Sequence, residues 1–297
     1  MENTMFRKML PILMILTLVL TACSFHISLP ITQQVGPTIT DEITVPLPTD
    51  ATQTVDLSLA FGAGTLKLHP GAGALVSGTA TYNVSDFKPT VTTSATVTNS
   101  GSTGSSVSIE QGNWRLTGIP NISNIKNEWD LALGSVPLAL TIDAGAYHAE
   151  YELGGLALTN LTISDGAADA KLNFASPNLT GMSLLSYTTG ASNVSLTGLG
   201  NANFASLEFN CGAGNYTLDF SGQFQRDGSV HIGTGVSNLT LVIPSGIPVQ
   251  ITVDGGLSNV TQDSGWIKNG NVYSQTGTGP QLTIVVKIGA GNLTITR

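Results

Sequence analysis

Apolar and polar residues alternate through most of the second half of the chain, and each alternating run begins at a bend centred on glycine. The runs Asn215-Tyr-Thr-Leu-Asp-Phe220 and Asn238-Leu-Thr-Leu-Val-Ile243 both place apolar side chains at every second position. A period of two is the signature of half-buried β-strands, and no helical period of 3.6 competes with it here. The pattern therefore predicts β-strands throughout this region.

The bends return at a nearly constant interval. Successive bends are separated by 21, 24, 22, 23 and 21 residues, and their glycines are Gly145, Gly166, Gly190, Gly212, Gly235 and Gly256. One coil of this length cannot bury its apolar face until the next coil stacks on it. We therefore predict an all-β, right-handed β-helix-like solenoid with coils of 21–24 residues. A pair of β-sandwiches is the alternative, which the less regular region 53–133 also permits.

A polar column accompanies the glycines. The residues three places after the last four of these glycines, and after a further glycine at position 289, are asparagines: Asn193, Asn215, Asn238, Asn259 and Asn292. Stacked asparagines can hydrogen-bond up and down a ladder. We expect a structural Asn ladder, with positive φ supplied by the neighbouring glycines. The Asn-x-Ser/Thr pattern at these positions also matches a glycosylation signal, but a ladder followed by an outward hydroxyl explains it without modification.

The amino terminus predicts export and lipid anchoring. Arg7 and Lys8 precede an apolar run from Met9 to Leu20, a segment that is short for a membrane span and typical of a signal peptide. The following Leu20-Thr-Ala-Cys23 resembles the lipobox of bacterial lipoproteins, which implies that Cys23 is acylated and begins the mature chain. An uncleaved anchor with an incidental cysteine is the alternative. We expect a protein held by its lipid on the outer side of a bacterial cytoplasmic membrane.

These patterns divide the chain into five parts. They are a lipoprotein signal peptide (1–22), a tether rich in Thr and Pro (23–52), an amino-terminal β region (53–133), the solenoid repeats (134–265) and a terminal coil (266–297) that we expect to close the stack as a cap. Gly62 resembles an early copy of the bend, so the pattern leaves open whether region 53–133 continues the solenoid.

Composition and charge limit the classes of molecule that this protein can bind. The chain has 34 Gly, only 10% charged residues and a formal net charge of −8. Lys and Arg are too few to track phosphates, so nucleic acid is excluded as a partner. With Cys23 lipidated, Cys211 stands alone, so no disulfide is expected; a small residue at a turn explains it better than a reactive thiol.

No catalytic or metal-binding motif is present, and we expect no cofactor. The four histidines, His26, His69, His148 and His231, are isolated from further ligands at metal spacing. Five carboxylates cluster within two successive coils: Asp143, Glu150, Glu152, Asp165 and Asp169. Paired carboxylates cleave polysaccharides in some β-helices, but charged side chains on exposed strands also prevent edge association. We favour the second explanation.

Several segments resemble a known family of envelope proteins. They include Gly62-Ala-Gly-Thr-Leu-Lys-Leu68, Leu75-Val-Ser-Gly-Thr-Ala-Thr-Tyr-Asn83 and Leu161-Thr-Ile-Ser-Asp-Gly-Ala-Ala-Asp169. These resemble the toast-rack domain, and the later coils resemble the related putative-adhesin β-solenoids and the carboxy-terminal domain of cell-wall-active-antibiotic response proteins. The resemblance covers residues 53–260 and implies a fold rather than a set of catalytic residues. At the first bend this chain has Gly145-Ala-Tyr-His148 where members often have Gly-Ala-Gly-Asp.

The sequence thus predicts a non-enzymatic, surface-tethered binding or scaffold protein. Rows of Thr, Ser and Asn on flat strand faces would contact a glycan or an envelope protein. The alternatives are an accessory that contacts a membrane sensor in envelope stress or signalling, and, third, a polysaccharide-cleaving enzyme.

Overall fold

The computed structural model describes residues 35–97, 103–112 and 124–297, and all of these except Asn124 belong to one compact unit. The predicted signal peptide, Cys23 and His26 lie outside the described residues. No helix of the described part is long and apolar enough to span a membrane.

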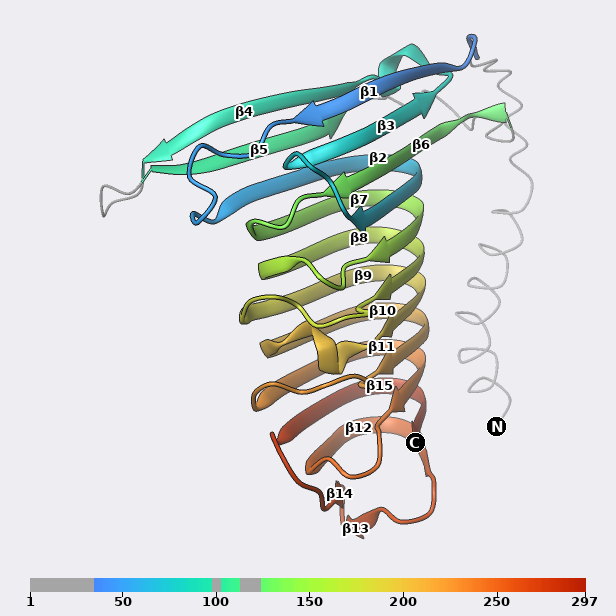
Figure 1. Cartoon of the computed structure of the whole chain (residues 1–297). Helices are drawn as coiled ribbons and strands as arrows, with labels where there is room; N and C mark the ends of the chain where they lie inside the picture. The colour runs from blue at the N-terminus through green and yellow to red at the C-terminus, as the bar shows by residue number, and fades with distance from the viewer. Residues whose placement is uncertain (1–34, 98–102, 113–123) are drawn as a thin grey trace, which may run out of the picture. The chain divides into compact units, whose positions relative to one another are not determined.

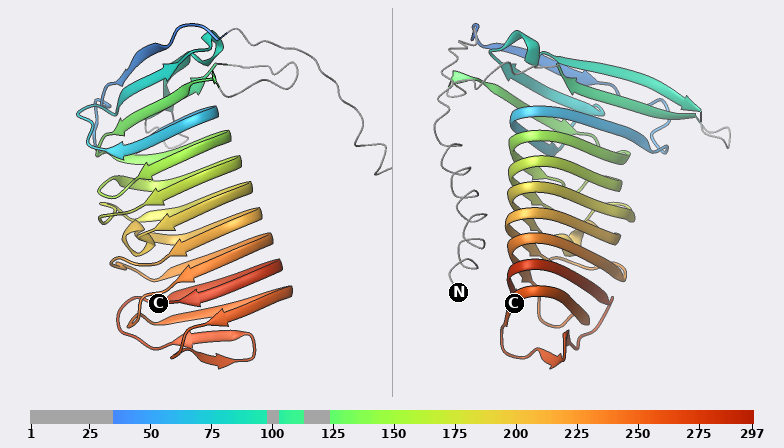
Figure 2. Two further views of the ribbon diagram at one scale, coloured as in Figure 1. Left: turned by 90° about the vertical axis from the view of Figure 1, so that its right-hand side faces the viewer. Right: turned by 180° about the vertical axis from the view of Figure 1, so that it is seen from behind.

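Eight long strands, bonded side by side in parallel, form the body of the unit (Figure 1). In spatial order they are β2 (Val55–Pro70), β7 (Pro137–Glu152), β8 (Ala157–Asn173), β9 (Met182–Thr197), β10 (Phe204–Asp219), β11 (Gly228–Val242), β15 (Leu282–Thr296) and β12 (Val249–Gln262). Each strand bends near its middle, and from β7 to β11 a short connection leads the chain into the neighbouring strand, so the chain forms a solenoid. Figure 2 shows its coils winding in the right-handed sense, as crossover connections between parallel strands almost always do. The predicted fold class is confirmed.

The alternation of side chains decides what each strand buries. In β10, Leu207, Phe209 and Leu218 are fully buried inside the bend, whereas Glu208 and Asn210 point outward. Burying one such apolar side chain contributes roughly 1.5–3 kcal/mol. The same rows recur in every coil and merge into one continuous core along the stack. The solenoid is therefore held together by contacts between coils, which no single coil could supply.

The bend glycines stack into a column because their backbones approach one another closely. A Cβ added to Gly190 would lie 2.3 Å from the carbonyl oxygen of Gly166, and one added to Gly212 would lie 2.5 Å from that of Gly190. None of the bend glycines has a positive φ. Our expectation that they supply positive φ was wrong. In three coils a positive φ occurs two residues later, at Gly64, Gly214 and Gly291, with values between 130° and 153°.

At the amino-terminal end the stack divides into two branches, each joined to β2 by a parallel strand and continued by antiparallel pairing. The first half of β2 pairs with β5 (Thr103–Gln111), which pairs with β4 (Pro89–Val97). The second half pairs with β6 (Asn127–Leu133), which continues to β3 (Val76–Tyr82) and β1 (Ile39–Val45). Strand β2 is thus the first coil, so this region continues the solenoid instead of forming a separate sandwich. A short 3₁₀ turn, η2 (Ser85–Phe87), links β3 to β4, and another, η4 (Leu199–Ala202), follows β9.

Strand β1 corrects the expected extent of the tether. We assigned residues 23–52 to a tether, but Ile39–Val45 pairs along its whole length with β3. Ile43 and Val45 are 3% and 2% exposed and join the core. The short alternation of Ile43 and Val45 with polar residues was hidden between Thr and Pro, so the sequence pattern missed it.

The last coil does not close the stack, which corrects our expectation for residues 266–297. Strand β15 lies between β11 and β12, parallel to both. Strand β12 is outermost, and only its residues Val249–Thr252 are covered, by a hairpin of β14 (Val272–Gln275) and β13 (Ile267–Asn269). The long connection after β12 allows β15 to insert between β11 and β12. This position fits β15 because every coil presents the same rows of side chains to its neighbours.

Candidate functional site

The predicted Asn column exists, but its spatial order differs from its order in the sequence. Asn215 donates through its amide nitrogen to Asn193 Oδ1 at 2.9 Å, and Asn238 donates to Asn215 at 3.0 Å. The next rung is Asn292, which donates to Asn238 at 2.7 Å, because β15 precedes β12 in the stack. Asn259 pairs with Asn292 in the strand register. The ladder thus joins four coils that span 100 residues of chain.

A second column of hydroxyl groups runs beside the ladder, two residues further along each strand. With the asparagines it forms what we call the Asn–Thr face. Its members are Asn193, Asn215, Asn238, Asn292 and Asn259, together with Ser195, Thr217, Thr240, Thr294 and Thr261. The asparagines are exposed, and the hydroxyl residues are half-buried except Thr261, which is exposed. This face presents both donors and acceptors and carries no ionisable group.

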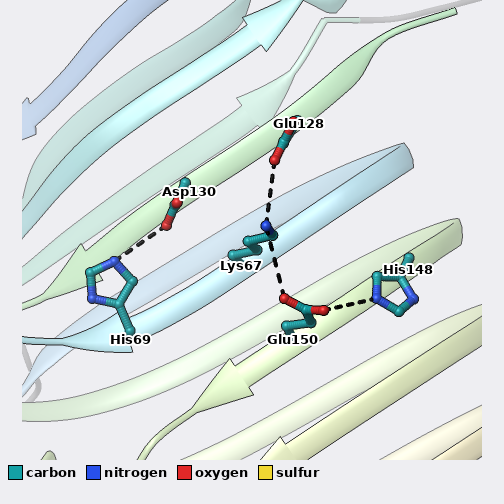
Figure 3. A network of polar contacts seen from close by, with 6 residues as sticks. All are labelled: Lys67, His69, Glu128, Asp130, His148 and Glu150. Atoms are coloured by element: carbon teal, nitrogen blue, oxygen red, sulfur yellow. Dashed lines mark hydrogen bonds and ion pairs between the residues drawn. The ribbon is translucent and has the colours of Figure 1, made fainter.

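The same surface changes character on the coils nearer the amino terminus. Lys67 on β2 lies 3.5 Å from Glu128 on β6 and 3.9 Å from Glu150 on β7 (Figure 3). His69 contacts Asp130 at 3.3 Å. We call this group, with His148 and Asp169, the charged cluster. It lies beside a hollow of about 390 Å³ that is also lined by Lys171 and Glu152.

His148 joins two coils within the charged cluster. Its Nε2 lies 3.3 Å from a Glu150 carboxylate oxygen, and its Nδ1 lies 3.5 Å from Asp169 on β8. The contact with His148 is the main cause that holds the pKa of Glu150 below its usual value, and Lys67 adds to it. These side chains are between about a third and two thirds exposed, so solvent screens the pairs and each contributes little stability.

An open trough of about 880 Å³ runs from β9 to β12 along the residues that immediately precede the bend, and Gly256 and Gly289 form part of its lining. Its walls mix hydroxyl, amide and charged groups, among them Thr188, Asn210, Asp254 and Lys287. Cys211 lies at its floor and is 9% exposed. Burial raises the pKa of the Cys211 thiol to about 12, so the thiol is protonated and unreactive at neutral pH.

The five clustered carboxylates do not share one face. Asp143 points outward before the bend of β7, whereas Asp169, Glu150 and Glu152 point outward after it. Glu152 accepts hydrogen bonds from the backbone of Gly154 and from the side chain of Asn173 on the neighbouring strand β8. Asp143 and Asp169, one from each of the two coils, are thus separated by the bend and do not form the carboxylate pair that polysaccharide cleavage would need.

Asp165 is the fifth carboxylate, and it is buried inside the bend at 8% exposure. It accepts hydrogen bonds from the hydroxyls of Tyr187 at 2.8 Å, Tyr147 at 3.4 Å and Thr189. Burial raises the pKa of both tyrosines well above its ordinary value, so they remain donors. These hydroxyls satisfy the carboxylate without a cation, which gives it a structural role.

The histidines do not form a metal site in the described part of the chain. No group of three or more His, Cys, Asp or Glu side chains there has the arrangement needed to hold an ion. His231 is exposed on β11, far in sequence from the charged cluster.

Sequence reasoning missed the charged cluster and the boundary that separates it from the Asn–Thr face. The change from charged to uncharged residues is visible in the sequence when equivalent positions of the repeat are compared. The residues five places after the bend are Lys67, Glu150 and Lys171 in the first three coils and only Ser or Thr in the remaining five. Glu128 and Asp130 come from a branch outside the repeat, so their meeting with Lys67 and His69 required the tertiary structure.

Distant similarity links this chain to solved structures of other proteins. No curated protein sequence matches the chain. A solved structure of a putative cell adhesion protein from Clostridium sporogenes ATCC 15579 is similar, with 19% identity and a TM-score of 0.49 over 88% of this chain and 99% of that one. A putative adhesin from Bacteroides fragilis NCTC 9343 has 10% identity and a TM-score of 0.33 over 87% of this chain and 97% of that one.

A family model gives the assignment that these distant structures cannot. The model for the N-terminal domain of toast_rack, DUF2154, matches residues 34–183, just over half of the chain. The matched segment contains both branches and the coils β2, β7 and β8. This chain therefore belongs to the toast-rack family.

Proposed function

We propose that this toast-rack protein is a lipid-anchored component of the bacterial cell envelope that works by binding or scaffolding and has no enzymatic activity. The anchor would be Cys23, and the solenoid would be displayed on the outer side of the cytoplasmic membrane. Two or three acyl chains on one residue give stable attachment, since each buried CH₂ contributes about 0.8 kcal/mol.

The observation that carries this proposal is the Asn–Thr face. A surface built on a stack of hydrogen-bonded strands is rigid, so it loses little conformational entropy when a partner binds. Its amides and hydroxyls repeat from coil to coil and offer many equivalent contacts. Repetition of weak equivalent contacts is suited to a polymeric or multivalent partner.

Metabolic labelling tests the anchor. Full-length chain expressed in a bacterial host with an alkyne fatty acid should incorporate the label and fractionate with membranes, and Cys23→Ala should do neither. Cys211→Ala is the matched control, because its thiol is buried and should leave labelling unchanged. Equal labelling of the Cys23→Ala variant would refute the proposed anchor.

Incubation with isolated envelope material tests the binding role. The full-length chain in mild detergent is mixed with cell-wall fragments, and both co-sedimentation and new reducing ends are measured in the same tubes. We expect capture without cleavage. New reducing ends that disappear in the Asp143→Asn, Asp169→Asn double variant would establish the enzymatic alternative instead. Failure of any envelope fraction to retain the protein would reject the binding role.

A further inference from the structure

The Asn–Thr face is distinguished from the rest of the solenoid by the absence of charge. On the five strands β9, β10, β11, β15 and β12, the outward positions three and five places after the bend contain only Asn, Ser and Thr. A surface designed for solubility is given about 25–35% charged residues. On the same surface, the coils β2, β7 and β8 carry the charged cluster. The boundary between the two halves falls between β8 and β9.

The face also has unused hydrogen-bonding capacity. Asn215 and Asn238 each use one amide N–H and one oxygen lone pair on their ladder neighbours, so a second N–H and a second lone pair remain on each of them. The hydroxyls of Thr217, Thr240 and Thr294 have no hydrogen-bond partner among the described residues. A ligand for this face must therefore offer donors and acceptors at similar density.

An apolar column lies along one side of the face. On β9, β10, β11 and β15, the residues one place after the bend are apolar and outward: Ala191, Ala213, Val236 and Ala290. Val236 is 66% exposed. This column provides a flat surface for C–H groups beside the two polar columns. A charged partner would find no opposite charge here, and burying its charge would carry a desolvation cost without compensation.

We propose that the Asn–Thr face binds an uncharged polysaccharide, whose hydroxyls match the amide and hydroxyl columns and whose C–H surfaces lie against the apolar column. The inference rests on the proposed binding function and identifies its ligand class and surface. Neighbouring coils are about 4.8 Å apart, and residues two apart on a strand are roughly 6.6 Å apart. Five coils therefore present a regular array roughly 19 Å long, enough for several sugar units in an extended chain.

Removal of the hydroxyl column tests the inference. In the triple variant Thr217→Val, Thr240→Val, Thr294→Val, the side chains keep their shape and strand preference but lose three free hydroxyls. The matched control is Ser186→Ala, Thr188→Val, Thr252→Val, which removes three hydroxyls from outward positions before the bend, on the other side of the glycine column. Circular dichroism and urea denaturation establish that both variants fold.

The probes are insoluble cellulose and chitin as uncharged polysaccharides, polygalacturonate beads as a charged one, and isolated cell-wall material. Full-length protein in mild detergent is titrated against each. We expect wild type and control to bind the uncharged probes, with affinity at least about tenfold lower for the triple Thr→Val variant, since each lost hydrogen bond weakens binding severalfold.

Four results would overturn the inference. If wild type binds cell-wall material but neither cellulose nor chitin, or if the triple Thr→Val variant binds them unchanged, the ligand class or the surface is wrong although the binding function stands. Loss of binding in the control alone would place the ligand in the trough. If wild type binds no probe and no envelope material, the proposed function fails and the inference fails with it.

Discussion

Two glycines of the same column should respond oppositely to alanine. In Gly190→Ala the new Cβ would lie 2.3 Å from the carbonyl oxygen of Gly166, roughly 1 Å closer than ordinary contact. The obstacle is backbone within a bonded strand, so the coils must separate locally. In Gly256→Ala the nearest atom is the carbonyl oxygen of Gly289 at 3.5 Å, an ordinary van der Waals contact. Neither glycine has a positive φ, so backbone strain does not enter.

The magnitudes follow from these distances. Overpacking of this kind costs about 1–3 kcal/mol, whereas restricting the unfolded chain by Gly→Ala returns about 0.4–1 kcal/mol. We expect Gly190→Ala to lower the free energy of unfolding by about 1–2 kcal/mol. The Gly256→Ala variant should leave that free energy unchanged or raise it by up to about 1 kcal/mol. Urea denaturation followed by circular dichroism measures both. Equal stability of the two variants would show that close approach is not the reason for glycine at the bend.

Three further experiments test other parts of the structure. Asn238→Ala removes two hydrogen bonds of the ladder and should reduce the free energy of unfolding by about 1–2 kcal/mol. Asn259→Ala, at the end of the Asn column, should change that free energy by less than about 0.5 kcal/mol. A larger effect of Asn259→Ala would contradict the observed strand order. Asp165→Ala leaves buried hydroxyls without an acceptor and should reduce the free energy of unfolding by about 2–4 kcal/mol. Exposed Asp143→Ala should stay within about 0.5 kcal/mol, and equal urea midpoints for these two aspartate variants would refute the structural role. In a Cys23→Ala background, burial and a pKa of about 12 predict that Cys211 reacts with a thiol reagent at pH 8 only after denaturation; rapid labelling of the folded protein would disprove this.

The sequence determined which residues are equivalent. A strand that alternates apolar and polar residues can bury only one face, and a fixed period places the same row of each coil above the last. The glycine column, the Asn ladder from Asn193 to Asn238 and the inward rows followed from this periodicity alone. The role of the glycines did not, because the pattern marks a bend without saying whether conformation or close approach requires it.

Only the tertiary structure decided the order of the last coils and the meeting of residues from outside the repeat. Every coil presents nearly the same rows to its neighbours, so the periodicity allows Asn292 to stack on either Asn238 or Asn259; the connection through β13 and β14 selects the place between them. The contacts of Lys67 with Glu128, and of β1 with β3, join segments without a shared period. Pairing between strands that are distant in sequence depends on how well their complete surfaces fit together. The local alternation of apolar and polar residues does not contain that information.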